Sequence, residues 1–357
     1  MTDRQRKKVL EDLKNGRINV LVGTHALIQE DVEFFKLGMI ITDEQHRFGV
    51  KQREKLIKKG QYPDILVMSA TPIPRTLAMV LYSDLDISVI DTMPKDRKPI
   101  DTFVVGSEMR KRVYDFMEQE IKKGHLAYVV CPAVEENELN VTSVEKHVEE
   151  LKKAYPHLKI CALHGKMKNE EKDLIIKNFK DRKIQVLVAT TVVEVGVDVP
   201  YATLMLVENA ERFGLAQLHQ LRGRVGRSNL KSYCILISDS KDEIAKARLK
   251  YMMQCHDGFE LAQKDLELRG PGEFLGTRQH GFYNFKIANI ASDMKLLETT
   301  KKVASRIVEE DLLNLPEYES LNKEYNTSFR RSFYNETCIH WFGRYIVLVY
   351  RFTVGLY

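Results

Sequence analysis

Short apolar runs that alternate with longer charged, amphipathic stretches are the feature that most restricts how this chain can fold. Early examples are residues 20–22, 39–41 and 65–68, and each is followed by a polar turn and a charged stretch. Runs of this length suit buried strands, and the amphipathic stretches suit crossover helices. This order is typical of a parallel β/α arrangement, so we predict an α/β fold.

A junction rich in proline and charge, residues 93–99, separates two copies of this pattern. The apolar runs resume after it at residues 102–105, 127–130, 160–163, 186–188 and 204–207. The second copy is therefore fuller than the first. Because a domain usually holds ~100–200 residues, a chain of 357 residues fits two domains and a smaller third part.

Helical sequence follows the second copy. Residues 239–264 are expected to form two helices with a break at 256–258. A glycine-rich loop, residues 268–281, precedes further helical sequence at about 290–311. This part of the chain is therefore expected to add helices and a loop rather than another sheet.

The last residues depart from this composition. Residues 338–357 are aromatic and largely apolar, but Arg344 and Arg351 interrupt them. The segment is too short and too interrupted to predict a membrane span. Two interpretations of the segment stay open: an edge hairpin, and a terminus that does not belong to the fold.

Charge and cysteine content narrow the class of protein. The formal net charge is +5, and residues 222–250 alone, with eight basic and three acidic side chains, carry an equal excess. A face that binds nucleic acid is one interpretation, and a solvated basic helix is the other. Five cysteines without a paired Cys-x-x-Cys motif indicate neither a disulfide framework nor a zinc site, and they fit a reduced cytosol. No apolar run follows the charged N-terminus, so no signal peptide or anchor is expected there.

Two adjacent carboxylates are the first candidates for catalysis. Asp43 and Glu44 directly follow the apolar run at 39–42, where open α/β sheets bind ligands. One carboxylate could hold a divalent cation while the other activates a water molecule. Alternatively, the pair simply begins the next helix as a cap and first-turn charge.

Three further segments favour catalysis over capping. Small hydroxyl residues, Ser69 and Thr71, follow the next run. The segment 189–200 follows a strand and has a glycine and an acid near its end, as a loop that contacts both a nucleotide and a nucleic acid would. Residues 220–227 space arginines among glycines, and guanidinium groups bind phosphate through parallel hydrogen bonds. Each segment is weak evidence alone, but their order on one scaffold is a specific pattern.

Taken together, these segments resemble a known family. DEQHRFGV (43–50), SATPIPRT (69–76), VLVATTVVEVGVDVP (186–200) and LAQLHQLRGRVGR (215–227) resemble motifs II, III, V and VI of superfamily-two helicases, and GTHAL (23–27) resembles motif Ib. More narrowly, the chain is similar to the RecG family of branched-DNA helicases, from near Met1 to about Leu321. Gln45 and the loop PGEFLGTRQHG (271–281) favour this family over the related transcription-repair coupling translocases.

The resemblance implies ATP and Mg²⁺ as cofactors. Asp43 would coordinate Mg²⁺, Glu44 would activate the attacking water, and Arg224 and Arg227 would act as arginine fingers on the γ-phosphate. Other residues would line the nucleotide cleft or couple nucleotide state to DNA: His46, Ser69, Thr71, Gly196, Asp198 and Gln220. Residues that would contact DNA or convert cleft closure into movement are Thr24, Thr190, Arg269, Gly270 and Gln279.

The resemblance also implies the organisation of the chain. It suggests tandem RecA-like parallel sheets, the first one truncated, followed by a helical hairpin and a loop. The implied segments are a remnant of the first RecA-like domain (1–95), a second RecA-like domain (96–240), a hairpin with a translocation loop (241–285), a C-terminal helical segment (286–335) and an atypical tail (336–357).

The implied activity is ATP-dependent remodelling of branched DNA, such as stalled forks and Holliday junctions, in recombination and repair. We expect branched or forked DNA as the partner, no membrane, a monomer and a bacterial cytoplasmic location. A phosphate-binding loop with Lys-Ser or Lys-Thr is not found in the chain, since its Gly165-Lys166 dipeptide is followed by Met167. We therefore expect the first domain to be cut, with apolar surface exposed, and the isolated chain not to turn over ATP.

Three alternatives stay open. A coupling translocase would share the ATP-driven chemistry but would be recruited to RNA polymerase. A non-catalytic DNA-binding fragment would use the second domain and hairpin without hydrolysis. A metal hydrolase built on Asp43, Glu44 and His46 is the least supported, because no second cluster of ligands is evident.

Overall fold

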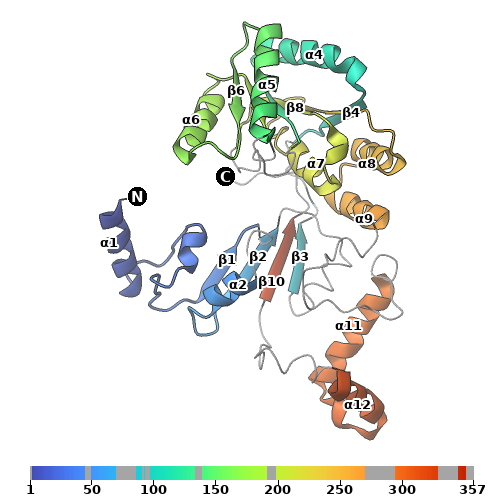
Figure 1. Cartoon of the computed structure of the whole chain (residues 1–357). Helices are drawn as coiled ribbons and strands as arrows, with labels where there is room; N and C mark the ends of the chain where they lie inside the picture. Colours follow the sequence, from blue (N-terminus) through green and yellow to red (C-terminus); the bar gives the residue numbers. More distant parts are fainter. Residues whose placement is uncertain are drawn as a thin grey trace. The chain divides into compact units, whose positions relative to one another are not determined.

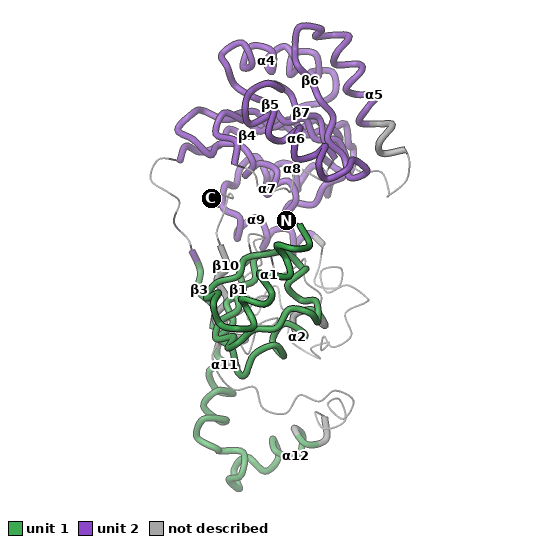
Figure 2. Tube along the Cα trace, turned by 90° about the vertical axis from the view of Figure 1, so that its left-hand side faces the viewer, with its two compact units in different colours: residues 1–69, 75–89, 284–350 green, residues 70–74, 90–283, 351–357 purple. Residues whose placement is uncertain are grey.

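The computed structural model describes residues 2–44, 50–69, 86–90, 92, 97–132, 139–190, 198–269, 294–328 and 345–350. The chain divides into two compact units, each of which is described by itself (Figure 2). Unit 1 comprises residues 1–69, 75–89 and 284–350, and unit 2 comprises residues 70–74, 90–283 and 351–357.

Unit 1 contains a four-stranded sheet in the order β1-β2-β10-β3 (Figure 1). The strands are β1 (Met39–Thr42), β2 (Asp64–Ser69), β3 (Asp86–Ile90) and β10 (Tyr345–Tyr350). β1 and β10 each pair in parallel with β2. The tail left open by the sequence therefore supplies an internal strand, between β2 and β3, rather than an edge hairpin.

The helices of unit 1 lie at the two ends of its sequence. They are α1 (Asp3–Lys14), η1 (His25–Ile28), α2 (Val50–Ile57), α11 (Met294–Glu309), η6 (Leu312–Asn314), η7 (Pro316–Tyr318) and α12 (Glu319–Ser328). Thr2 and Gln5 form a reciprocal capping box that starts α1. The helix expected at 290–311 is confirmed by α11.

The strand predicted at residues 20–22 is wrong. These residues have no regular secondary structure, and Val20 and Val22 are 79% and 90% exposed. β1 is the edge strand of the sheet formed by the described residues, so no partner strand satisfies an extended segment there. An apolar run alone does not make a strand when nothing pairs with it.

Unit 2 is built on a six-stranded sheet in the order β4-β9-β8-β5-β7-β6, and its neighbouring strands pair in parallel. The strands are β4 (Asp101–Val105), β5 (Leu126–Val130), β6 (Ile160–Leu163), β7 (Val186–Ala189), β8 (Ala202–Val207) and β9 (Tyr233–Ile237). All residues of β5, β7 and β8 are buried, as expected for central strands covered on both faces. The five runs predicted in this half are confirmed, whereas β9 was not predicted.

Helices cover both faces of this sheet. They are η3 (Ser107–Met109), α4 (Arg110–Lys122), α5 (Leu139–Ala154), α6 (Asn169–Lys180), η5 (Ala210–Arg212), α7 (Leu215–Arg222), α8 (Glu243–Gln254) and α9 (Gly258–Arg269). Tyr128 of β5 packs in one core with residues of α6 to α9, and its neighbour Val129 packs in the other with residues of α4 and α5. Alternate side chains of one strand thus enter opposite cores.

The predicted helical pair is confirmed as α8 and α9, with a break at residues 255–257. Arg222, at the end of α7, is 1% exposed and holds this break together. Its Nη1 donates to the carbonyl oxygens of Met252 and Cys255, each at 2.9 Å. These carbonyls lie at the end of α8, where a helix leaves acceptors without helical donors. Burial lowers the pKa of Arg222.

Candidate functional site

Predicted site residues from two neighbouring strands lie at the carboxyl edge of the unit 1 sheet. Asp43 follows β1, and Ser69 is the last residue of the parallel neighbour β2. Thr42 lies opposite Val67, so both strands end at the same edge. The structure therefore brings Asp43, Glu44 and Ser69 together at the position where parallel sheets bind ligands.

The backbone at this edge is unusual. Glu44 has a positive φ of 51°, which a residue with a side chain seldom adopts. Its backbone N–H donates to Oδ1 of Asp43 at 2.8 Å. Such conformations cost roughly 1–3 kcal/mol and concentrate at functional sites. Carboxylate oxygens are the donors that Mg²⁺ takes alongside nucleotide phosphates, so the side chains here fit the implied cation.

Unit 2 contains three arginines and one carboxylate that we call the arginine cluster: Arg97, Arg224 and Arg227 with Asp198. Nη1 of Arg227 lies 3.5 Å from Oδ1 of Asp198, and the Arg227 side chain is only 2% exposed. Arg224 is also buried. Burial raises the pKa of Tyr128 to about 12, while the charges of Arg227 and Arg224 act to lower it.

Glycine shapes the loop that carries the cluster. α7 ends at Arg222, and Gly223 follows it as the C-cap. Gly226 has a φ of +71°, and a Cβ there would lie 2.8 Å from Cγ1 of Ile100. A residue with a side chain would therefore be strained and would displace Ile100. This requirement explains Gly226, the glycine that lies between Arg224 and Arg227 in the sequence.

The other predicted residues are distributed over both units. Gln220 is half-buried on α7, and Thr190 follows β7 and is buried. Thr24 is exposed just before η1, and Arg269 is the last residue of α9. Outside the described residues lie Gln45, His46, Thr71, Gly196, Gly270 and Gln279. Of the predicted set in unit 2, the structure pairs Asp198 with Arg227.

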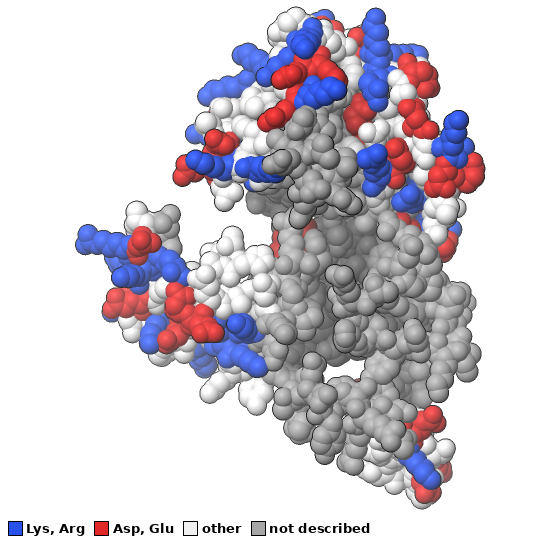
Figure 3. All heavy atoms as spheres, viewed as in Figure 1, with Lys and Arg blue, Asp and Glu red and all other residues white. Residues whose placement is uncertain are grey.

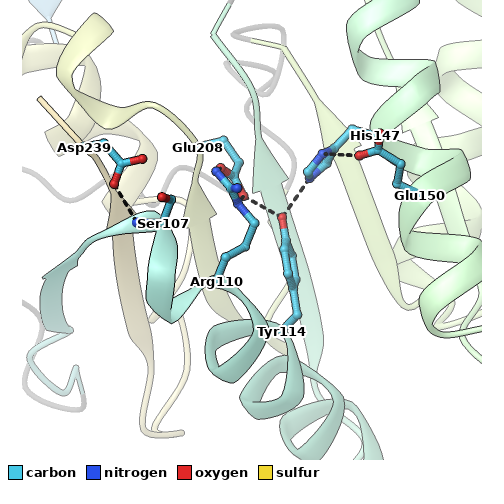
Figure 4. Close-up of polar contacts among 7 residues, drawn as sticks. All are labelled: Ser107, Arg110, Tyr114, His147, Glu150, Glu208 and Asp239. Atoms are coloured by element: carbon cyan, nitrogen blue, oxygen red, sulfur yellow. Dashed lines mark hydrogen bonds and ion pairs between the residues drawn. The ribbon is translucent and has the colours of Figure 1, made fainter.

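A buried polar network that the sequence did not suggest lies beyond β8 (Figure 4). Glu208 accepts two hydrogen bonds from Arg110, at 3.2 and 2.9 Å, and one from the hydroxyl of Tyr114 at 2.7 Å. Nε2 of His147 lies 2.8 Å from the same hydroxyl. Burial and the Glu208 charge raise the pKa of Tyr114, and burial lowers that of His147. These residues come from the position directly after β8 and from α4 and α5, so no local motif could indicate the network.

The basic stretch at 222–250 is not a solvated basic face along its arginine-rich part. Arg222 and Arg224 are buried, as is the side chain of Arg227. Lys231 pairs with Asp101 at 3.0 Å. On the face drawn in Figure 3, described basic and acidic side chains are interspersed. The charge excess in the sequence therefore marks an internal site more than a surface patch.

Within the described residues, no helix combines the length and the apolar character that a membrane span requires.

Three family models match successive parts of the chain. "DEAD/DEAH box helicase" matches residues 1–80, and "Helicase conserved C-terminal domain" matches residues 108–229. "ATP-dependent DNA helicase RecG, domain 3, C-terminal" matches residues 255–339. The order agrees with the motifs identified in the sequence.

Curated relatives give the same result. The chain is 49% identical over 326 residues to the ATP-dependent DNA helicase RecG of Bacillus subtilis, which covers 90% of this chain and 48% of that protein. It is 49% identical over 318 residues to the RecG of Thermotoga maritima, covering 88% and 41% respectively. The chain thus spans about half the length of the curated relatives it matches.

A solved structure titled "Structure of RecG bound to three-way DNA junction" is 46% identical, with a TM-score of 0.66, and the match covers 84% of this chain and 38% of that one. The Mycobacterium smegmatis helicase Lhr, 18% identical with a TM-score of 0.50 over 71% of this chain and 36% of that one, shares the fold. The α/β class with RecA-like parallel sheets is therefore confirmed.

Proposed function

We propose that this chain, which belongs to the RecG-type helicases as their C-terminal portion, contributes ATP-dependent remodelling of branched DNA. The observation that carries this proposal is the 49% identity over 326 residues, because that region holds both the carboxylate edge and the arginine cluster. The relative bound to a three-way junction supports branched DNA, at forks and Holliday junctions, as the substrate.

Residues of the carboxylate edge and of the arginine cluster would each have a role in hydrolysis. Bound Mg²⁺ would neutralise charge on the phosphates of ATP. Asp43 would hold the cation, and Glu44 would orient and deprotonate the attacking water. Arg224 and Arg227 would stabilise charge that develops on the γ-phosphate, a role worth ~10³–10⁵-fold in rate in well-studied cases. Asp198, Gly196 and Gln220 would line the nucleotide site.

The remaining residues would connect hydrolysis to DNA. His46, Ser69 and Thr71 would transmit nucleotide state, and Thr24 and Thr190 would contact the backbone of the strand. Of the last two, Thr24 is exposed and Thr190 is buried, so Thr24 is the better placed for a direct contact. Arg269, Gly270 and Gln279 would convert closure of the nucleotide site into movement along duplex DNA.

The proposal keeps the five segments expected from the sequence: 1–95, 96–240, 241–285, 286–335 and 336–357. The compact units group residues 284–350 with residues 1–69 and 75–89. We also propose that the RecG-type protein to which this portion belongs is a monomer in a bacterial cytoplasm, in line with the bacterial origin of the relatives.

A chimera tests the function. The 326 matching residues of the Bacillus subtilis RecG are replaced with this chain, and ATP hydrolysis is measured with and without a three-way junction. We expect junction-stimulated hydrolysis that Glu44→Gln lowers by about 10³-fold, because the water loses its base. Glu30→Gln is the matched control, since this carboxylate side chain is 95% exposed. A Glu44→Gln chimera that hydrolyses ATP at the unmodified rate would exclude the role given to Glu44.

One observation favours a second candidate for the chain by itself. No Lys-Ser or Lys-Thr phosphate-binding loop occurs in its 357 residues. The isolated chain is then a DNA-binding module that does not turn over ATP. Binding of a three-way junction that is indifferent to ATP would support this candidate, and robust DNA-stimulated hydrolysis by the isolated chain would exclude it.

A further inference from the structure

Arg97 is a member of the arginine cluster that none of the helicase motifs contains. It lies four residues before β4, in the segment that leads from β3 of unit 1 into unit 2. Its Nε donates to the carbonyl oxygen of Gly226 at 3.2 Å. Gly226 directly precedes Arg227, so this hydrogen bond holds the peptide from which Arg227 projects.

The Arg97 guanidinium also interacts with the charges of Arg227 and Asp198. Burial and the positive charge of Arg227 lower the pKa of Arg97, while the carboxylate of Asp198 raises it. Arg227 itself pairs with Asp198 and donates from Nε to the carbonyl of Gly223 at 3.4 Å. Arg227 is thus restrained at its side chain by Asp198 and Gly223, and at its backbone by Arg97.

The segment around Arg97 is fixed to the same loop at more than one point. Ile100 packs where a Cβ of Gly226 would lie. The N–H of Asp101 donates to the carbonyl of Ser232 at 3.1 Å. The stretch that enters unit 2 is therefore packed along the loop that carries Arg227.

We propose that Arg97 is a positioning residue for Arg227: by binding the Gly226 carbonyl it holds the loop so that the Arg227 guanidinium meets the γ-phosphate. This inference rests on the proposed ATP hydrolysis. A guanidinium acting on a transition state is effective only when it is already in place, since a displacement of about 1 Å can cost ~10²-fold in rate. Arg97 acts through Arg227 and needs no contact with the nucleotide.

Kinetics of the chimera described above separate positioning from binding. Arg97→Gln is expected to lower kcat by about 10- to 100-fold, a part of the arginine-finger effect, and to leave KM for ATP within about 2-fold. Lys98→Gln is the matched control, because it removes the same charge from an exposed neighbour. An unchanged kcat in Arg97→Gln, or an equal loss in Lys98→Gln, would overturn the proposal.

A second measurement on the isolated 357-residue chain does not depend on hydrolysis. The Nε–H signal of Arg227, assigned by its loss in Arg227→Lys, is followed by NMR with ¹⁵N-labelled arginine. We expect Arg97→Gln to shift this signal and to speed its exchange with water several-fold, while Lys98→Gln leaves it unchanged. An unaltered signal in Arg97→Gln contradicts the proposal.

The two measurements distinguish the two possible failures. If the chimera with the unmodified chain does not hydrolyse ATP, the proposed function fails, and the NMR result still decides whether Arg97 holds Arg227. If Arg97→Gln does not fold, Arg97→Lys replaces it. Lysine keeps the charge but lacks the Nε–H group and the planar fork, so the same loss of kcat without a change in KM is expected.

Discussion

At the scale of single residues, buried arginines have two different tasks in unit 2. Arg227 pairs with the carboxylate of Asp198, whereas Arg222, five residues before Arg227, satisfies the end of α8. Nη2 of Arg222 also lies 2.9 Å from Nδ1 of His219. Neighbouring arginines in one motif thus separate into a structural residue and candidates for phosphate binding.

The structural task of Arg222 makes a prediction. Arg222→Met keeps the length of the side chain but leaves the Met252 and Cys255 carbonyls without their donor. Each buried acceptor that loses its partner costs about 1–3 kcal/mol, so for two acceptors unit 2 should lose roughly 2–6 kcal/mol of unfolding free energy. Urea unfolding followed by circular dichroism measures this loss. Lys250→Met, at an exposed position on α8, should change the midpoint little, and equal midpoints for the two variants would show that Arg222 is dispensable.

Whether a site residue could be predicted from the sequence depends on how close in the chain the residues that define its position lie. Asp43 follows β1 and Ser69 ends β2, so a parallel sheet alone places them at one edge. Asp198 and Arg227 pair as members of motifs that a family resemblance identifies together. Arg97 and Glu208 were missed because their partners are 129 and 98 residues away in the chain. No spacing rule connects residues that only tertiary packing brings together.

At the scale of elements, strand prediction succeeded where burial is complete on both faces. The runs that became β5, β7 and β8 are continuous apolar segments. β9, equally apolar, was missed because it lies inside a stretch whose basic residues dominated the interpretation. The run at 20–22 failed for the opposite reason, since its side chains have no partner strand.

In unit 1, the edge strand β1 exposes apolar side chains on one face. Met39 and Ile41 alternate with buried residues along β1 and are 53% and 57% exposed, and Val20 and Val22 add to the exposed apolar surface of the unit. Parallel strands are normally covered on both faces. This exposure agrees with the expectation of apolar surface in the first domain.

This face gives a prediction about solution behaviour. The isolated chain should bind the apolar dye ANS and self-associate, because the exposed strand side chains bury themselves against any available apolar surface. The double variant Met39→Thr, Ile41→Thr should reduce dye fluorescence and the apparent mass in light scattering. Leu174→Thr, at a 59% exposed position on α6 of unit 2, is the control. Equal dye binding in both variants would locate the responsible surface elsewhere.

At the scale of the whole molecule, the mixed surface limits how DNA can be held. A net charge of +5 is small for 357 residues, and described basic side chains stand among acidic ones (Figure 3). Much of the local excess at 222–227 is buried in the arginine cluster and at the end of α8. Binding of DNA should therefore depend on a few defined contacts rather than on a broad positive field.

Salt dependence distinguishes charged contacts from uncharged ones among the proposed DNA residues. The logarithm of the binding constant falls with the logarithm of salt concentration, with a slope of about −0.9 for each phosphate neutralised by a cation. Arg269→Gln should reduce the magnitude of that slope by ~1, because one cationic contact is lost. Thr24→Val should weaken binding at every salt concentration and leave the slope unchanged, since a hydroxyl group releases no counterion. Fluorescence anisotropy with a labelled three-way junction, at several salt concentrations, measures both slopes.

Lys98→Gln controls for the loss of one exposed charge outside the proposed contacts. If Arg269→Gln leaves the slope at its unmodified value, Arg269 makes no contact with a phosphate, and the link between the end of α9 and DNA movement loses its physical basis.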